Sequence, residues 1–240
     1  MTTETTIGEI VRANPASSRI FEHLGIDYCC GGKKSLAEVC RTKGLDASTV
    51  VAMLSAIDTL PGEAQVYPDA MTLTQLCDHI QQAHHAYLRE ELPRLDFMTQ
   101  KVLAVHGEHE PRLRQLRKAF EAFNAEMTAH TNEEDEVVFP AIRSLEAGQT
   151  EEPSALPAAL AKLERDHDGA GALLEQFKAL TDSYTPPDWA CNTFRALYAA
   201  LAHLEKDTHQ HVSKENSVLF PKALAAATAA LEATRQPVRR

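Results

Sequence analysis

Two short segments of the sequence pair a histidine with a glutamate four residues later. His130 precedes Glu134, His211 precedes Glu215, and the second pair follows the first by 81 residues. Residues four positions apart lie about 40° apart around an α-helix, so the imidazole and the carboxylate of each pair share one helix face. Imidazole and carboxylate groups on one face can together bind a transition-metal ion. One such pair is common on surface helices, but the duplicated version indicates a metal centre.

The residues around each pair repeat at the same offset. Apolar positions follow alternating steps of three and four, which is typical of the buried seam of a bundle helix. The first seam comprises Leu113, Leu116, Phe120, Phe123, Met127 and Val137, and the second comprises Phe194, Leu197, Leu201, Leu204, Thr208 and Val218. A Phe-Pro dipeptide also follows each glutamate by five residues. Because an unpaired buried carboxylate is costly, the glutamates on these seams are expected to bind a metal inside the bundle.

The duplication predicts further ligands on the two preceding helices. His85 and His167 lie 82 residues apart, and similar apolar stripes follow them. The predicted ligands are therefore His85, His130, Glu134, His167, His211 and Glu215. His84 fits the pattern almost as well as His85, so the choice between them stays open. His106 lies roughly 30 Å along the helix from His85, so we leave it out of the set. Two carboxylates shared by two metal ions would leave about two imidazoles for each ion. Mixed imidazole and carboxylate ligation suits iron best among the common redox metals, and zinc and manganese stay open.

Helix signals along the chain predict an all-α protein. Capping patterns start helices after Thr6, Ser35 and Thr72, and Pro93 predicts a kink in the first long helix. Four longer helices in two related hairpins predict an up-down-up-down four-helix bundle, which follows a small helical N-terminal domain. The expected boundaries are 1–60 for the small domain, 61–71 for a linker, 72–231 for the bundle and 232–240 for a solvated tail.

Composition excludes several classes of function. The formal net charge of −10 argues against nucleic-acid binding, which requires a basic surface. No apolar run is long enough to span a bilayer, and the N-terminus lacks the pattern of a secretory signal. We therefore expect a cytoplasmic protein without a membrane partner. The sequence leaves a monomer and a homodimer both open.

Adjacent cysteines in the small domain form a second candidate site. Cys29 and Cys30 are followed by two glycines, and neighbouring cysteines pair only in a strained, reducible ring. Lys33 and Lys34 are expected to lower the pKa of a thiol by favouring its thiolate. Redox switching, capture of a metal ion and reaction with nitric oxide all stay open, as does a turn without chemistry. The other cysteines, Cys40, Cys77 and Cys191, are expected to be buried in helices.

The bundle motifs resemble the hemerythrin-like HHE cation-binding domain. Together with the motif Asp27-Tyr28-Cys29-Cys30-Gly31-Gly32, they make the chain similar to the repair-of-iron-centres family of di-iron proteins. The resemblance covers nearly the whole chain. It implies two iron ions per chain, bridged by oxide or hydroxide and held by the six predicted ligands. It also assigns the family's thiol motif to Cys29 and Cys30, as redox or transfer thiols.

The implied function is the repair of iron–sulfur clusters damaged by nitric oxide or peroxide, by donation of iron to damaged iron–sulfur proteins. The alternative is binding, buffering or reduction of nitric oxide or dioxygen at the same di-iron site, and whether the protein is an enzyme stays open. Two positions depart from oxygen-carrying hemerythrins: Gly171 replaces a histidine and Asn216 replaces an aspartate. These departures argue against simple oxygen carriage and predict a less saturated, more labile site.

Overall fold

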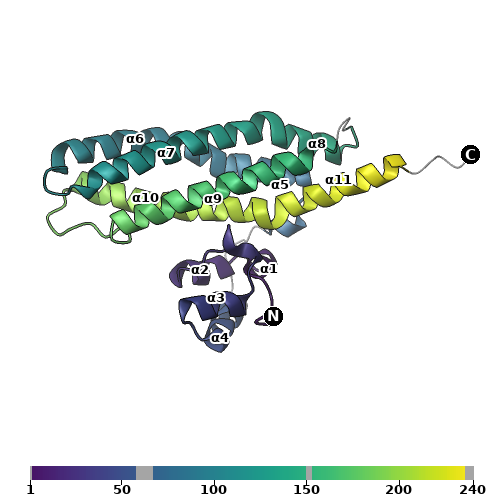
Figure 1. Cartoon of the computed structure of the whole chain (residues 1–240), viewed down its shortest axis with the longest axis horizontal. Coiled ribbons are helices and arrows are strands. Elements are labelled where there is room, and N and C mark those ends of the chain that lie inside the picture. The colour runs from purple at the N-terminus through teal and green to yellow at the C-terminus, as the bar shows by residue number, and fades with distance from the viewer. Residues whose placement is uncertain (1, 58–66, 150–152, 236–240) are drawn as a thin grey trace, which may run out of the picture. The chain divides into compact units, whose positions relative to one another are not determined.

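The structure, a computed structural model, describes residues 2–57, 67–149 and 153–235. These residues form helices and connecting turns, with no β-strand among them, which confirms the all-α prediction (Figure 1). Most of the expected linker and the end of the expected tail lie outside the described residues. The contacts between residues divide the chain into two compact units. The first unit comprises Met1–Asp78, Ala141–Pro157 and His209–Arg240, and the second comprises His79–Pro140 and Ala158–Thr208. In the described part of the chain, none of the helices has both the length and the apolar character needed to cross a membrane.

The N-terminal module, residues 2–57, consists of four short helices around its own apolar core. The helices are α1 (Ile7–Ala13), α2 (Ser17–His23), α3 (Leu36–Lys43) and α4 (Ala47–Ile57). As predicted, the Thr6 side chain and Glu9 form a reciprocal capping box at the start of α1. Ser35 caps α3, which ends at Gly44 in the left-handed conformation that glycine favours (φ 67°). The core residues include Phe21, Tyr28, Leu36 and Leu54, all fully buried.

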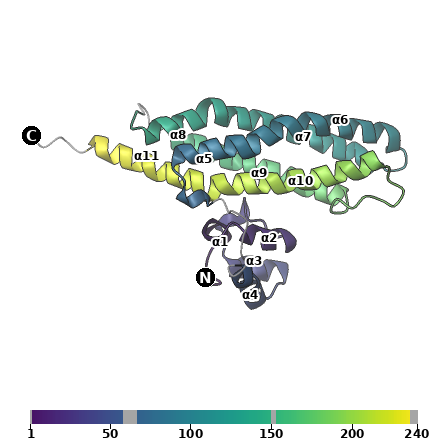
Figure 2. The same ribbon diagram turned by 180° about the vertical axis from the view of Figure 1, so that it is seen from behind.

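Four long helices form the bundle. They are α6 (Ala86–His106), α7 (Arg112–Glu133), α9 (Leu156–Leu180) and α10 (Asn192–Lys214). All four contribute to one buried core that contains Leu95, Phe120, Phe123, Phe177 and Leu201. Both views show these helices side by side (Figures 1 and 2). The structure thereby confirms the predicted bundle. The α6 helix is continuous through Pro93, and the kink expected there stays a prediction.

Three of the bundle segments contain a π-helical turn, which the sequence analysis did not foresee. These turns are η3 (Gln81–His85) after α5 (Leu73–Ile80), η4 (Glu134–Val138) before α8 (Phe139–Glu146), and η5 (Glu215–Leu219) before α11 (Phe220–Arg235). In η4 the Phe139 N–H donates to the carbonyl of Glu134, five residues back, and Pro140 then has no N–H to donate. Phe220 and Pro221 repeat this arrangement in η5. The recurring Phe-Pro dipeptide thus marks the two turns that begin with the candidate glutamates.

The π turn in η4 overturns one expected seam position. We expected Val137 to be buried, but it is 60% exposed, whereas Val138 is buried. A π turn adds one residue, which rotates the following side chains by about 100° relative to a continuous α-helix. In the second copy both Val218 and Leu219 are buried. The 3,4 spacing of buried residues is therefore present before each glutamate. After the π turn, the position that this spacing predicts is buried only in the second copy.

Within the first unit, the N-terminal module contacts η5 closely. A Cβ added to Gly8 would lie 2.8 Å from Ser217 Oγ and 3.1 Å from the carbonyl oxygen of Gly32. The side chain of Asn216 donates to the carbonyl of Cys29 at 3.4 Å. Gly8 is therefore required for the close approach of α1 and the cysteine loop to the turn that begins at Glu215.

Substitution of Gly8 tests this contact. We expect Gly8→Ala to lower the free energy of unfolding by about 1–3 kcal/mol, as overpacked substitutions do, and to speed amide exchange in α1 and η5. Gly169→Ala is the control, because a Cβ there meets its nearest atom at 3.5 Å and alanine favours a helix. Equal effects of the two substitutions on exchange in α1 would contradict the interpretation.

Candidate metal centre

The side chain of His85 is oriented by Asp135. His85 is the last residue of η3, is fully buried, and stacks on Phe139 with ring centroids 5.5 Å apart. Its Nδ1 lies 2.8 Å from Asp135 Oδ1. Asp135 also accepts a hydrogen bond from Gln81 at 2.6 Å and pairs with Arg89. This arrangement directs Nε2 of His85 towards Glu134, as the carboxylate partner of a metal-binding histidine commonly does.

Asp135 is ionised at neutral pH. Burial of this carboxyl group favours its neutral form, but the hydrogen bonds from His85 and Gln81 and the charges of His85 and Arg89 outweigh that effect and lower its pKa. The lowered pKa means that the interaction stabilises the folded protein above the ordinary pKa of an aspartate and is lost as the pH falls through the folded-state value. At neutral pH the carboxylate is therefore present to hold the His85 ring.

Glu134 Oε2 lies between two imidazoles. It is 3.3 Å from Nε2 of His85 and 3.3 Å from Nε2 of His130, and Nε2 of His130 lies 3.0 Å from Nε2 of His167. Neighbouring ligands on one ion with metal–ligand bonds of about 2.0–2.1 Å lie roughly 3 Å apart. The separations are therefore those expected of groups that bind metal ions.

The second His-Glu pair repeats this arrangement. His211 Nε2 lies 2.8 Å from Glu215 Oε1, and both side chains are fully buried. Glu215 begins η5 just as Glu134 begins η4. Each glutamate is thus the first residue of a π turn, a feature that is frequent at functional sites.

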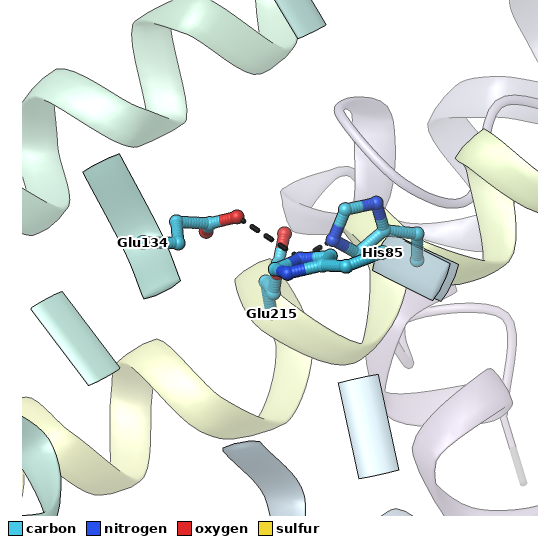
Figure 3. Close-up of side chains that lie close together, drawn as sticks. His85, Glu134 and Glu215 are labelled. Atoms are coloured by element: carbon cyan, nitrogen blue, oxygen red, sulfur yellow. Dashed lines mark hydrogen bonds and ion pairs between the residues drawn. The ribbon is translucent and has the colours of Figure 1, made fainter. Parts of the chain in front are cut away.

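All six predicted ligands occur in two groups of side chains whose ligand atoms lie within 4.8 Å of one another. The groups are His85, Glu134, His211 and Glu215, and His130, Glu134, His167 and Glu215. Figure 3 shows His85, Glu134 and Glu215 pointing towards one another. Both glutamates belong to both groups, and each group adds two imidazoles. A buried donor set of this composition suits divalent cations of the iron, zinc or manganese type.

Two other histidines considered in the sequence lie elsewhere. His84, the alternative to His85, is buried with its Nδ1 2.9 Å from Asp207 Oδ1 and is in neither group. His106 Nε2 lies 3.2 Å from Cys191 Sγ. Asp135 is not among the residues predicted for the site, because an α-helical register turns the residue after Glu134 away from the seam. The only sign in the sequence that Asp135 belongs to the site is its position directly after Glu134.

The thiols differ from expectation in two respects. Cys191 is exposed rather than buried, because it precedes the first residue of α10, whereas Cys40 and Cys77 are buried as expected. The pKa of Cys29 is raised well above its usual value, by its hydrogen bond with Cys30 and by burial, instead of lowered by lysines. Lys33 and Lys34 are exposed to solvent. Cys29 is therefore a neutral thiol at physiological pH.

Two protein-family models match the chain. Residues 3–58 match the ScdA_N model, described as a domain of unknown function (DUF542), and residues 78–223 match the hemerythrin HHE cation-binding domain. The chain is 39% identical over 227 residues to the iron–sulfur cluster repair protein ScdA of Staphylococcus haemolyticus, covering 92% of this chain and 99% of the relative. It is 35% identical over 218 residues to the iron–sulfur cluster repair protein YtfE of Edwardsiella ictaluri, covering 91% and 96%.

Thiol alkylation in the metal-free protein tests the state of Cys29. We expect slow modification at neutral pH and faster modification as the pH rises, because the thiolate is the reacting form and the pKa of Cys29 is raised. Peptide mass spectrometry would follow each cysteine, with exposed Cys191 as the internal reference. Equal rates for Cys29 and Cys191 at neutral pH would contradict the burial and protonation of Cys29.

Removing the charge of Asp135 tests its role in orienting His85. We expect Asp135→Asn to weaken metal binding about 10–100-fold, the usual effect of losing such a partner. Asp207→Asn is the matched control, since Asp207 makes an equivalent contact with His84. Competition with a chelator of known affinity measures both variants. A loss in Asp207→Asn as large as that in Asp135→Asn would contradict a specific role of Asp135 in orienting His85.

Proposed function

Because the chain belongs to the family of iron–sulfur cluster repair proteins that includes ScdA and YtfE, and through residues 78–223 to the hemerythrin HHE cation-binding family, we propose that it repairs damaged iron–sulfur clusters. The observation that carries the proposal is the buried set of four imidazoles and two shared carboxylates. In this proposal iron is both held by the protein and donated, and damaged iron–sulfur proteins are the partners that receive it.

Two iron ions per chain would occupy the bundle. His85 and His211 would hold one ion, His130 and His167 the other, and Glu134 and Glu215 would bridge them, with an oxide or hydroxide as a further bridge. The iron would supply redox chemistry and exchangeable coordination positions. The carboxylates of Glu134 and Glu215 would offset the charge of the iron in the buried site. Asp135 fixes the orientation of the His85 imidazole.

The number of protein ligands supports an exchangeable centre. Each group offers four side chains. Non-haem iron often binds more than four ligands, so coordination positions stay open when the protein supplies few of them. An ion with open positions can pass to an acceptor more easily than one enclosed by protein. The proposal locates the protein in the cytoplasm, where reducing conditions keep Cys29 and Cys30 as thiols.

The same open positions favour a second candidate function. A ferrous centre with vacant coordination positions can bind nitric oxide or dioxygen, so buffering, binding or reduction of these molecules under nitrosative or oxidative stress is the alternative. Reversible binding without any transfer of iron to another protein would favour this alternative over repair.

Metal content tests the ligand assignment. We expect Glu134→Ala to lose most of its bound iron and the absorption of the centre, because it removes the carboxylate that lies between His85 and His130. Glu133→Ala is the control, because Glu133 directly precedes Glu134 but pairs with Lys162 near the surface. Iron analysis and absorption spectra of both proteins provide the measurement. Full iron content in Glu134→Ala would contradict the proposed bridging role.

Cluster repair itself requires a functional assay. The iron-loaded protein is mixed with an apo iron–sulfur enzyme and a sulfide source, and recovery of the enzyme activity is followed. We expect recovery beyond that given by the same concentration of free iron, and we expect Glu134→Ala to give none beyond it. No difference between the loaded protein and free iron would refute donation.

A further inference from the structure

A third group of metal-binding side chains lies outside the bundle, in the cysteine loop. Asp27, Cys29 and Cys30 each offer a ligand atom, and these atoms lie within 4.8 Å of one another. The sulfur atoms of Cys29 and Cys30 are 3.6 Å apart, and Cys29 Sγ lies 3.1 Å from Asp27 Oδ1. The group contains none of the imidazoles or glutamates assigned to the bundle.

The distance between the two sulfur atoms fits a shared metal ion better than a disulfide. A disulfide bond is about 2.05 Å long and joins residues whose Cα atoms are usually more than 4.4 Å apart, farther than adjacent residues allow. Two thiolates on a tetrahedral ion, at about 2.3 Å each, are separated by roughly 3.7 Å. The observed 3.6 Å separation therefore requires little movement for both sulfur atoms to bind one ion.

Backbone hydrogen bonds fix the carboxylate beside the thiols. Asp27 accepts from the N–H groups of Cys29 (2.9 Å), Cys30 (3.0 Å) and Gly31 (2.8 Å). A Cβ on Gly31 would lie 3.1 Å from Asp27 Oδ2, so glycine permits this close approach. The loop is thus organised before any ion arrives, which lowers the entropic cost of binding.

The loop is held from both sides and is still accessible. On one side the Tyr28 hydroxyl donates to Glu22 at 2.9 Å, and its ring is buried in the core of the module. On the other side the Asn216 amide donates to the carbonyl of Cys29. Cys29 is buried, but Cys30 is only partly buried and Asp27 is exposed. An ion can therefore reach the sulfur of Cys30 and the carboxylate from solvent.

We propose that Asp27, Cys29 and Cys30 form a separate binding site for a divalent transition-metal ion of the zinc or ferrous type. Thiolate ligands select ions of this class over magnesium or calcium. On binding, both thiols lose their protons to solvent and the ion takes the place of the proton that Cys29 now shares with Asp27. Two sulfur atoms and one oxygen atom leave a fourth tetrahedral position open, so the ion can exchange with an incoming ligand. This binding claim does not depend on the repair function.

Cobalt(II) is a suitable probe, because thiolate ligands give it a charge-transfer absorption that imidazole and carboxylate ligands do not. The full-length protein is first loaded with two iron ions per chain, its metal content is measured to exclude a third ion at the cysteines, and cobalt is then titrated without oxygen and without added thiols. We expect one further equivalent of cobalt, a sulfur-to-cobalt absorption band and the release of two protons per ion. Absence of the band in the wild-type protein would overturn the proposal.

Variants assign the ligands. Cys29→Ser and Cys30→Ser should each weaken cobalt binding about tenfold or more, and the double variant should lose the band. Asp27→Asn retains an oxygen for the backbone N–H groups but loses its charge, so it should bind more weakly and keep the band. Cys191→Ser, at an exposed thiol, should behave as the wild type. A band that persists in the Cys29→Ser/Cys30→Ser protein, or disappears in Cys191→Ser, would refute the site. Iron content before titration shows separately whether the bundle centre is intact.

Discussion

Two carboxylates buried in the core of a helical bundle are the constraint on which the structure depends. Glu134 and Glu215 are fully buried, and moving an ionised carboxylate away from water costs several kcal/mol unless other groups compensate. Imidazoles lie beside them, and bound metal cations would offset the cost of burying their charge. The apolar seams hold the helices together, while the buried donor set suits metal cations. We therefore expect metal binding and folding of this part of the bundle to be coupled.

Much of this architecture can be predicted from repetition in the sequence. The interval of 81 residues reveals two related hairpins, and the 3,4 steps leading to His130 and His211 identify the seams. Capping residues such as Thr6 and Ser35 also locate helix starts, because their side chains satisfy N–H groups within one turn. These signals are local or periodic, and the physical rules behind them need no knowledge of the surrounding fold.

The details that sequence reasoning missed arise where the helix departs from regular periodicity. A π turn changes the register by one residue, so Val138 is buried in place of Val137 and Asp135 reaches the His85 ring. The neighbouring lysines suggested a lowered pKa for Cys29, but burial and the bond to Cys30 act in the opposite direction. The choice between His84 and His85 likewise depends on which carboxylate each ring meets, and those carboxylates are 50 or more residues away.

The two halves have diverged at one position that matters for both candidate sites. Asp135 in the first half corresponds to Asn216 in the second, and each directly follows a candidate ligand. Asp135 carries a charge and orients His85, whereas Asn216 is neutral and donates to the carbonyl of Cys29. An aspartate at 216 could not donate this hydrogen bond and would repel the backbone carbonyl. The duplicated position thus holds the imidazole of His85 in one half and donates a hydrogen bond to the cysteine loop in the other.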